Sequence, residues 1–180
     1  MNLPNKLTLL RAIMIPFFVA FMLIDLGDTG KYIALVIFVV ASMTDWLDGY
    51  LARKNNLVTN FGKFMDPLAD KLLVCAAMIC LVGMGKLASW IVIIIISREF
   101  IISGFRLIAS DNGIVIAASY WGKIKTVCQM IMIILLILDL DIIVFQQITL
   151  IITYLAVILT VVSLIDYLVK NKNVISEGSR

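Results

Sequence analysis

Hydrophobic residues fill six long runs of this chain, and polar residues gather in the shorter segments between them. The runs cover residues 7–26, 32–43, 72–84, 87–108, 126–138 and 142–169. At about 1.5 Å of rise per residue, a helix of about 20 residues crosses about 30 Å of hydrocarbon, and some of these runs need a polar turn to reach that length. The pattern predicts an all-α fold, an integral-membrane bundle of six transmembrane helices in one domain over residues 1–180.

Composition and the placement of charge support a membrane location. Of the 180 residues 62% are hydrophobic, which is more than a water-soluble domain of this size can bury. Six spans put both termini on one side, and that side receives most lysines and arginines, whereas the other holds only Lys31 and Lys86. Because cytoplasmic loops are rich in basic residues, we expect a multi-pass protein of the cell (plasma) membrane with cytoplasmic termini. We expect no cleaved signal peptide, and a flexible tail over residues 171–180.

Two aspartates interrupt the hydrocarbon pattern at the cytoplasmic end of the second predicted span. The stretch "IALVIFVVASMTDWLDGYLARK" runs without a proline or a turn cluster, so we expect one continuous helix. Asp45, Asp48, Gly49 and Ala52 then occupy positions i, i+3, i+4 and i+7, which is one helical face. The two small residues suit a bulky ligand that lies against the backbone beside the carboxylates.

Two further aspartates lie at the start of the third predicted span. A helix is expected to begin near residues 61–67, where Pro67 is tolerated in a first turn. Gly62, Asp66 and Asp70 recur every four residues and share a face. The second and third helices are expected to be antiparallel neighbours joined by a short cytoplasmic loop. Their acidic faces can therefore meet close to the membrane surface.

Four carboxylates in a poorly solvated place cannot all stay ionised unless something neutralises them. Oxygen ligands select hard cations such as Mg²⁺ or Mn²⁺, and four carboxylates are enough to share two ions. The alternative is structural: Asp66 caps a helix, and Asp45 or Asp48 pairs with Arg53 or Lys71. That alternative accounts for single aspartates more readily than for all four in register.

At these positions the chain resembles the CDP-alcohol phosphatidyltransferase family, whose signature it matches throughout as Asp45-x2-Asp48-Gly49-x2-Ala52-Arg53-x8-Gly62-x3-Asp66-x3-Asp70. The six-span pattern extends the resemblance over essentially the whole chain. It implies displacement of CMP from a CDP-linked donor by an alcohol, with two divalent cations, in a homodimer. It also implies that Asp45, Asp48, Asp66 and Asp70 bind metal, and that Asp70 is catalytic because it accepts the proton of the hydroxyl. The donor would be bound by Gly49, Ala52, Arg53, Thr59 and Gly62.

Basic residues near the same membrane face bear on the identity of the alcohol. Arg98 lies deep in an apolar run, where an unpaired cation is costly. Glu99 projects about 100° away around the helix, so we do not expect it to pair with Arg98. A cationic pocket implies an acceptor that carries a phosphate. The residues expected there are Arg98, Arg106, Lys123, Lys125, Thr8 and Arg11. Alternatively, Arg106 and the lysines only anchor helices at the interface, and Thr8 only caps a turn.

The stretches 97–110 and 119–130, with the N-terminal "NLPNKLTLLR", look like the glycerol-phosphate branch of the family. This resemblance implies CDP-diacylglycerol as donor, sn-glycerol 3-phosphate as acceptor, and phosphatidylglycerophosphate and CMP as products, within membrane lipid. Two other acceptors stay open: phosphatidylglycerol, as in a cardiolipin synthase, or an inositol phosphate. A divalent-cation transporter is a remote alternative, because transport sites lie near the bilayer midplane rather than at one face.

Other chemistry is excluded by residue content. The chain has no histidine, which rules out a Ser-His-Asp triad, histidine-ligated zinc and a phosphohistidine intermediate. Cys75, Cys80 and Cys128 lie in apolar runs without a CxxC pair, so we expect buried thiols rather than disulfides or ligands. The net charge of +3 follows from the topology and gives no indication of nucleic-acid binding.

Overall fold

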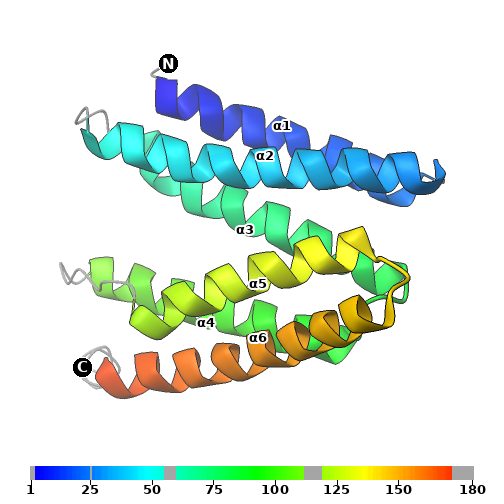
Figure 1. Ribbon diagram of the computed structural model, residues 1–180. Helices are drawn as coiled ribbons and strands as arrows, with labels where there is room; N and C mark the ends of the chain where they lie inside the picture. Colours follow the sequence, from blue (N-terminus) through cyan, green and yellow to red (C-terminus); the bar gives the residue numbers. More distant parts are fainter. Residues whose placement is uncertain (1–2, 25, 55–59, 112–118, 172–180) are drawn as a thin grey trace. The chain divides into compact units, whose positions relative to one another are not determined.

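A computed structural model describes residues 3–24, 26–54, 60–111 and 119–171. For some helical residues it describes the backbone but not the side chain; these are residues 3–6, 45–54, 60–67, 70 and 110–111. The described residues form helices and no strand, which confirms the predicted all-α class. In chain order the helices are α1 (Leu3–Leu23), α2 (Gly27–Lys54), α3 (Asn60–Gly83), α4 (Ser89–Asp111), α5 (Tyr120–Leu138) and α6 (Ile143–Lys170) (Figure 1). Each predicted hydrophobic run coincides with one of them.

The helices divide into two compact units, Met1–Lys86 and Leu87–Arg180. In the first unit α1 packs on both α2 and α3, and α2 also contacts α3. Phe18 and Phe38 join α1 to α2, with ring centroids 5.8 Å apart. Small side chains such as Ala34 and Ala41 are fully buried on α2 and allow the two helices to approach closely. α2 begins at Gly27, whose φ of +58° favours glycine.

In the second unit α6 packs on both α5 and α4. The N-terminus of α5 is capped by Ser119, whose Oγ accepts a hydrogen bond from the Gly122 N–H at 3.1 Å. Its C-terminus is closed by Asp139, which is left-handed at φ 41° and whose N–H donates to the Leu135 carbonyl at 3.0 Å. The chain then returns as α6, so α5 and α6 run antiparallel in Figure 1.

Three of the helices in the described part of the chain, α2, α5 and α6, are long and apolar enough to cross a membrane. Shorter apolar helical segments cover Leu7–Leu23 and Lys71–Gly83. α4 has sufficient length, but Arg98, Glu99 and Arg106 interrupt its apolar sequence. Large apolar side chains of α6 point outward, including Ile143, Ile151, Ile158 and Ile165, each more than half exposed. Such a surface suits hydrocarbon, and the protein is a helical membrane protein.

Candidate active site

The four aspartates occupy the facing ends of two consecutive helices. α2 continues unbroken to Lys54 and α3 begins at Asn60, which confirms the two predicted helix boundaries. Asp48 stands six residues before the end of α2 and Asp66 six residues after the start of α3. Each backbone position is therefore about 9 Å along its helix from the connection. The structure describes the backbone of all four aspartates but not their side chains. The metal cluster therefore stays a prediction.

The residues predicted to bind the donor lie around the same connection. Gly49, Ala52 and Arg53 belong to the last turns of α2, and Gly62 belongs to the first turn of α3. Thr59 precedes α3 and lies outside the described residues. α2 contacts α3 within the first unit, so the backbones that carry these positions belong to neighbouring helices.

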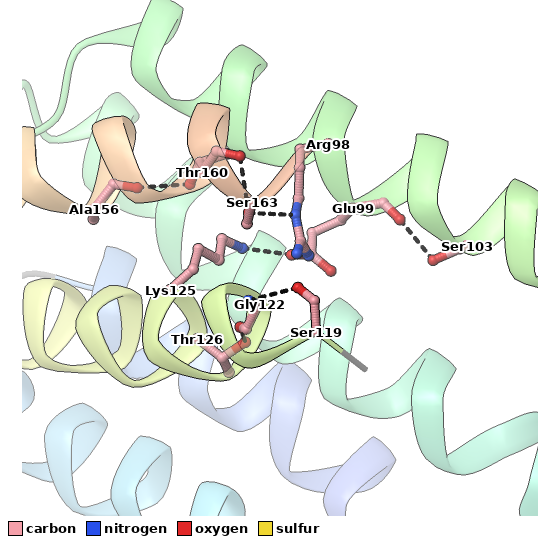
Figure 2. A network of polar contacts seen from close by, with 10 residues as sticks. All are labelled: Arg98, Glu99, Ser103, Ser119, Gly122, Lys125, Thr126, Ala156, Thr160 and Ser163. Atoms are coloured by element: carbon pink, nitrogen blue, oxygen red, sulfur yellow. Dashed lines mark hydrogen bonds and ion pairs between the residues drawn. The ribbon is translucent and has the colours of Figure 1, made fainter. Parts of the chain in front are cut away.

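Two of the predicted acceptor residues, Arg98 and Lys125, come together in the second unit. Arg98 Nη1 donates to Glu99 Oε1 at 3.0 Å, and Lys125 Nζ forms an ion pair with the same oxygen (Figure 2). The expectation that Glu99 would not pair with Arg98 was therefore wrong. Adjacent helical residues start in directions about 100° apart. The two long side chains are flexible enough to close that angle beyond their first carbons.

Arg98 has a further partner on α6 that the sequence did not predict. Arg98 Nε donates to Ser163 Oγ on α6 at 3.2 Å, and Ser163 in turn donates to the Thr160 carbonyl at 2.9 Å. Ser163 and Thr160 are fully buried. The available signal was their polarity, because Thr160 and Ser163 are the only polar residues in the apolar stretch 155–165 of α6. Arg98 is thereby fixed from two directions, and α4, α5 and α6 all contribute to the cluster.

Burial makes the charge of this cluster significant. Arg98 is 7% exposed and Lys125 is 1% exposed. The Glu99 side chain is 23% exposed. Arg98, Glu99 and Lys125 together carry two positive charges and one negative charge, so these three side chains leave a surplus of positive charge. Cations held in a poorly solvated place attract anions strongly, and a phosphate with several acceptor oxygens fits both a guanidinium and an ammonium. The chemistry of the cluster is therefore consistent with the predicted binding of a phosphorylated acceptor, which stays a prediction.

The remaining predicted acceptor residues lie in different environments. Arg106 on α4 and Lys123 in the first turn of α5 are exposed. Thr8 and Arg11 on α1 are almost fully buried, and Arg11 is among the largest fully buried side chains of the described part of the chain. They belong to the first unit, whereas Arg98 and Lys125 belong to the second. None of the three cysteines takes part in a disulfide, and Cys80 and Cys128 are buried whereas Cys75 is partly buried.

Comparison with known proteins gives these positions a family context. The family model described as CDP-alcohol phosphatidyltransferase matches residues 1–162. That match covers the first compact unit, most of the second, and all the positions of the aspartate signature.

Bacterial relatives named CDP-diacylglycerol–glycerol-3-phosphate 3-phosphatidyltransferase are similar over most of the chain. The Bacillus subtilis protein is 52% identical over 141 residues, which are 72% of this chain and 73% of the relative. The Haemophilus influenzae protein is 43% identical over 173 residues, covering 93% of this chain and 91% of the relative. The Rickettsia typhi protein is 40% identical over 137 residues, or 76% of each chain.

Proposed function

We propose that this chain, which belongs to the CDP-alcohol phosphatidyltransferase family, transfers a phosphatidyl group from CDP-diacylglycerol to sn-glycerol 3-phosphate. The hydroxyl oxygen of the acceptor forms a bond to the phosphorus that bears the diacylglycerol, and the bond from that phosphorus to CMP breaks. The products are phosphatidylglycerophosphate and CMP. The observation that carries the proposal is the 43% identity, over 93% of this chain, to a relative named for that transfer.

The proposal assigns two divalent cations, Mg²⁺ or Mn²⁺, to Asp45, Asp48, Asp66 and Asp70. The donor set consists of carboxylates only, which fits hard cations, and its members lie on two neighbouring helices at matching distances from their connection. When bound, such cations neutralise the diphosphate of the donor and stabilise the charge that develops on CMP.

The proposal gives separate roles to Asp70 itself and to the other residues near the connection between α2 and α3. Asp70 accepts the proton of the acceptor hydroxyl as its oxygen attacks, which makes it the general base. Gly49, Ala52 and Gly62 lack large side chains and leave room for the nucleotide half of the donor. Arg53 and Thr59 contact that half as well, Arg53 through a guanidinium that matches phosphate geometry.

The acceptor phosphate is assigned to the cluster around Arg98 and Lys125. Their burial and the surplus positive charge support this assignment, because an anion of matching geometry stabilises cations that water does not reach. The proposal also assigns Arg106, Lys123, Thr8 and Arg11 to acceptor binding, as the sequence predicted. A phosphorylated alcohol is therefore favoured over an uncharged one.

The proposal places the protein in the cell membrane with six spans, one domain, and both termini and the active site cytoplasmic. The apolar helices support a membrane location, and the distribution of basic residues supports the orientation. The pairing of Glu99 with Arg98 and Lys125 lowers the cost of inserting α4, because it partly compensates the charges that interrupt its apolar sequence. A homodimer is proposed from the family resemblance.

The test is the release of CMP by detergent-purified protein supplied with CDP-diacylglycerol and Mg²⁺, with and without glycerol 3-phosphate. Release that requires both acceptor and metal is the expected result. Release stimulated instead by phosphatidylglycerol or by an inositol phosphate would keep the transfer chemistry and contradict the proposed acceptor. No release with any alcohol would contradict the proposed activity. Cross-linking of the same preparation checks the homodimer.

A further inference from the structure

We propose that Gly122 is a positioning residue for the acceptor phosphate, because its lack of a side chain lets the Arg98 guanidinium occupy the orientation in which Nη2 is left to bind that phosphate. This inference rests on the proposed function and deepens it by adding a residue of α5 that acts through Arg98. Nothing in the signature of the aspartates, or in the basic residues predicted from the sequence, points to Gly122.

The first step concerns the donors of Arg98. Its guanidinium has three nitrogens, and two of them are engaged: Nε donates to Ser163 Oγ at 3.2 Å and Nη1 donates to Glu99 Oε1 at 3.0 Å. Within the described part of the chain Nη2 has no such acceptor. Because the guanidinium is planar and rigid, fixing Nε and Nη1 also fixes the direction of Nη2. Nη2 is therefore a donor already directed toward an incoming oxygen anion.

The second step concerns the space around Nη2. A Cβ atom placed on Gly122 would lie 3.1 Å from Arg98 Nη2 and 3.4 Å from Ser119 Oγ. The first distance is tighter than ordinary carbon–nitrogen contact, so the guanidinium would have to move by a few tenths of an ångström. The hydrogen bonds to Ser163 and Glu99 hold the guanidinium in place and resist this movement (Figure 2).

The third step concerns the helix that carries Gly122. Gly122 lies in the first turn of α5, where Ser119 caps its N–H. The start of a helix carries partial positive charge and favours an anion nearby. Nη2 and the first turn of α5 therefore present positive charge to the same small region. Lys125, one turn further along α5, adds its ammonium to the cluster through Glu99.

The test compares two alanine substitutions of helical glycines in the same unit. Gly122→Ala brings a methyl group to Arg98 Nη2, whereas Gly104→Ala on α4 places a methyl group where nothing lies within 4 Å. Both changes raise helix propensity, so neither is expected to prevent folding. For Gly122→Ala we expect the KM for glycerol 3-phosphate to rise about fivefold or more, as for a weakened charge-assisted hydrogen bond. The kcat and the KM for CDP-diacylglycerol should stay close to wild type, and Gly104→Ala should leave all three unchanged.

Inorganic phosphate serves as a second probe. Its inhibition constant against glycerol 3-phosphate should rise in Gly122→Ala by the same factor as the KM, because both report the phosphate pocket. Ser163→Ala, which removes the acceptor of Arg98 Nε, should shift both quantities in the same direction and provides an independent route should Gly122→Ala purify poorly.

The outcomes separate this inference from the function on which it rests. A wild-type enzyme that releases CMP with glycerol 3-phosphate, together with a KM for Gly122→Ala equal to that for Gly104→Ala, would overturn the role of Gly122 alone. A fall in kcat with unchanged acceptor KM would overturn it as well. Absence of acceptor-dependent release by the wild type would overturn the proposed function and this inference with it.

Discussion

Lys125 on α5 and Glu99 on α4, 26 positions apart in the chain, form an ion pair at the same carboxylate oxygen that accepts a hydrogen bond from Arg98. One acidic side chain thereby gathers two buried cations that would otherwise repel each other. Because Glu99 compensates only one of two positive charges, the cluster stays attractive to an anion. In the proposed six-span topology these ion pairs also lower the cost of inserting α4, so one feature serves both insertion and the proposed phosphate pocket.

Replacing Lys125 with methionine should weaken acceptor binding. The variant keeps the length of the side chain but removes its charge, so one charge-assisted contact to the acceptor phosphate is lost. We expect the KM for glycerol 3-phosphate to rise about tenfold or more, with the KM for CDP-diacylglycerol little changed. Steady-state kinetics of CMP release measure both quantities.

Lys170→Met is the matched control for this change. Lys170 pairs with Asp166 at the end of α6, but its side chain is 62% exposed. Exposed ion pairs contribute little, so this variant should behave as wild type. Equal effects of the two substitutions would show that Lys125 has no special part in acceptor binding.

Asp66→Asn and Asp70→Asn should each abolish turnover in protein that still inserts and folds. Asparagine has nearly the same shape as aspartate but lacks the charge that a hard cation requires and the basicity that proton transfer requires. We expect losses of at least about a hundredfold in kcat, as for removal of a general base. Asp28→Asn is the control, since Asp28 pairs with Lys31 and is 82% exposed. Near-normal activity of either active-site variant would contradict the assigned roles.

Removal of divalent cations should stop the reaction reversibly. With a chelator present, the purified enzyme should release no CMP, and added Mg²⁺ or Mn²⁺ should restore release. The donor then keeps its uncompensated diphosphate charge, which repels the attacking oxygen. Full activity in the presence of chelator would show that the four carboxylates do not act by binding divalent cations.

Much of the fold was predictable because it depends on local patterns. Hydrophobic runs located every helix, and the absence of helix breakers before Lys54 predicted that α2 would extend past its apolar part. The spacing of the aspartates placed each pair on one helical face through helical periodicity alone, and the family followed from the resemblance of the whole motif to a known signature.

The cluster around Arg98 was only partly predictable because it depends on contacts between distant segments. The sequence indicated that a buried arginine needs partners, yet it did not show that Ser163, 65 positions later, is one of them. Angular spacing on an ideal helix led to the wrong expectation for Glu99, because it describes Cβ directions and not the reach of long side chains. The role proposed for Gly122 depends on a distance to another helix, which no local pattern contains.

The orientation of the chain can be tested with single cysteines at four described positions. In intact cells a membrane-impermeant maleimide should label Asp28→Cys and Asp141→Cys, which the predicted topology places outside. It should label Tyr120→Cys and Lys170→Cys only after permeabilisation, because these positions begin α5 and end α6, and the predicted topology puts both helix ends in the cytoplasm. The wild-type protein is the control, since its three thiols lie within helices. Labelling of Asp141→Cys and Lys170→Cys from the same side would mean that α6 does not cross the membrane. A reversed pattern at all four positions would place the basic ends, and with them the proposed active site, outside the cytoplasm.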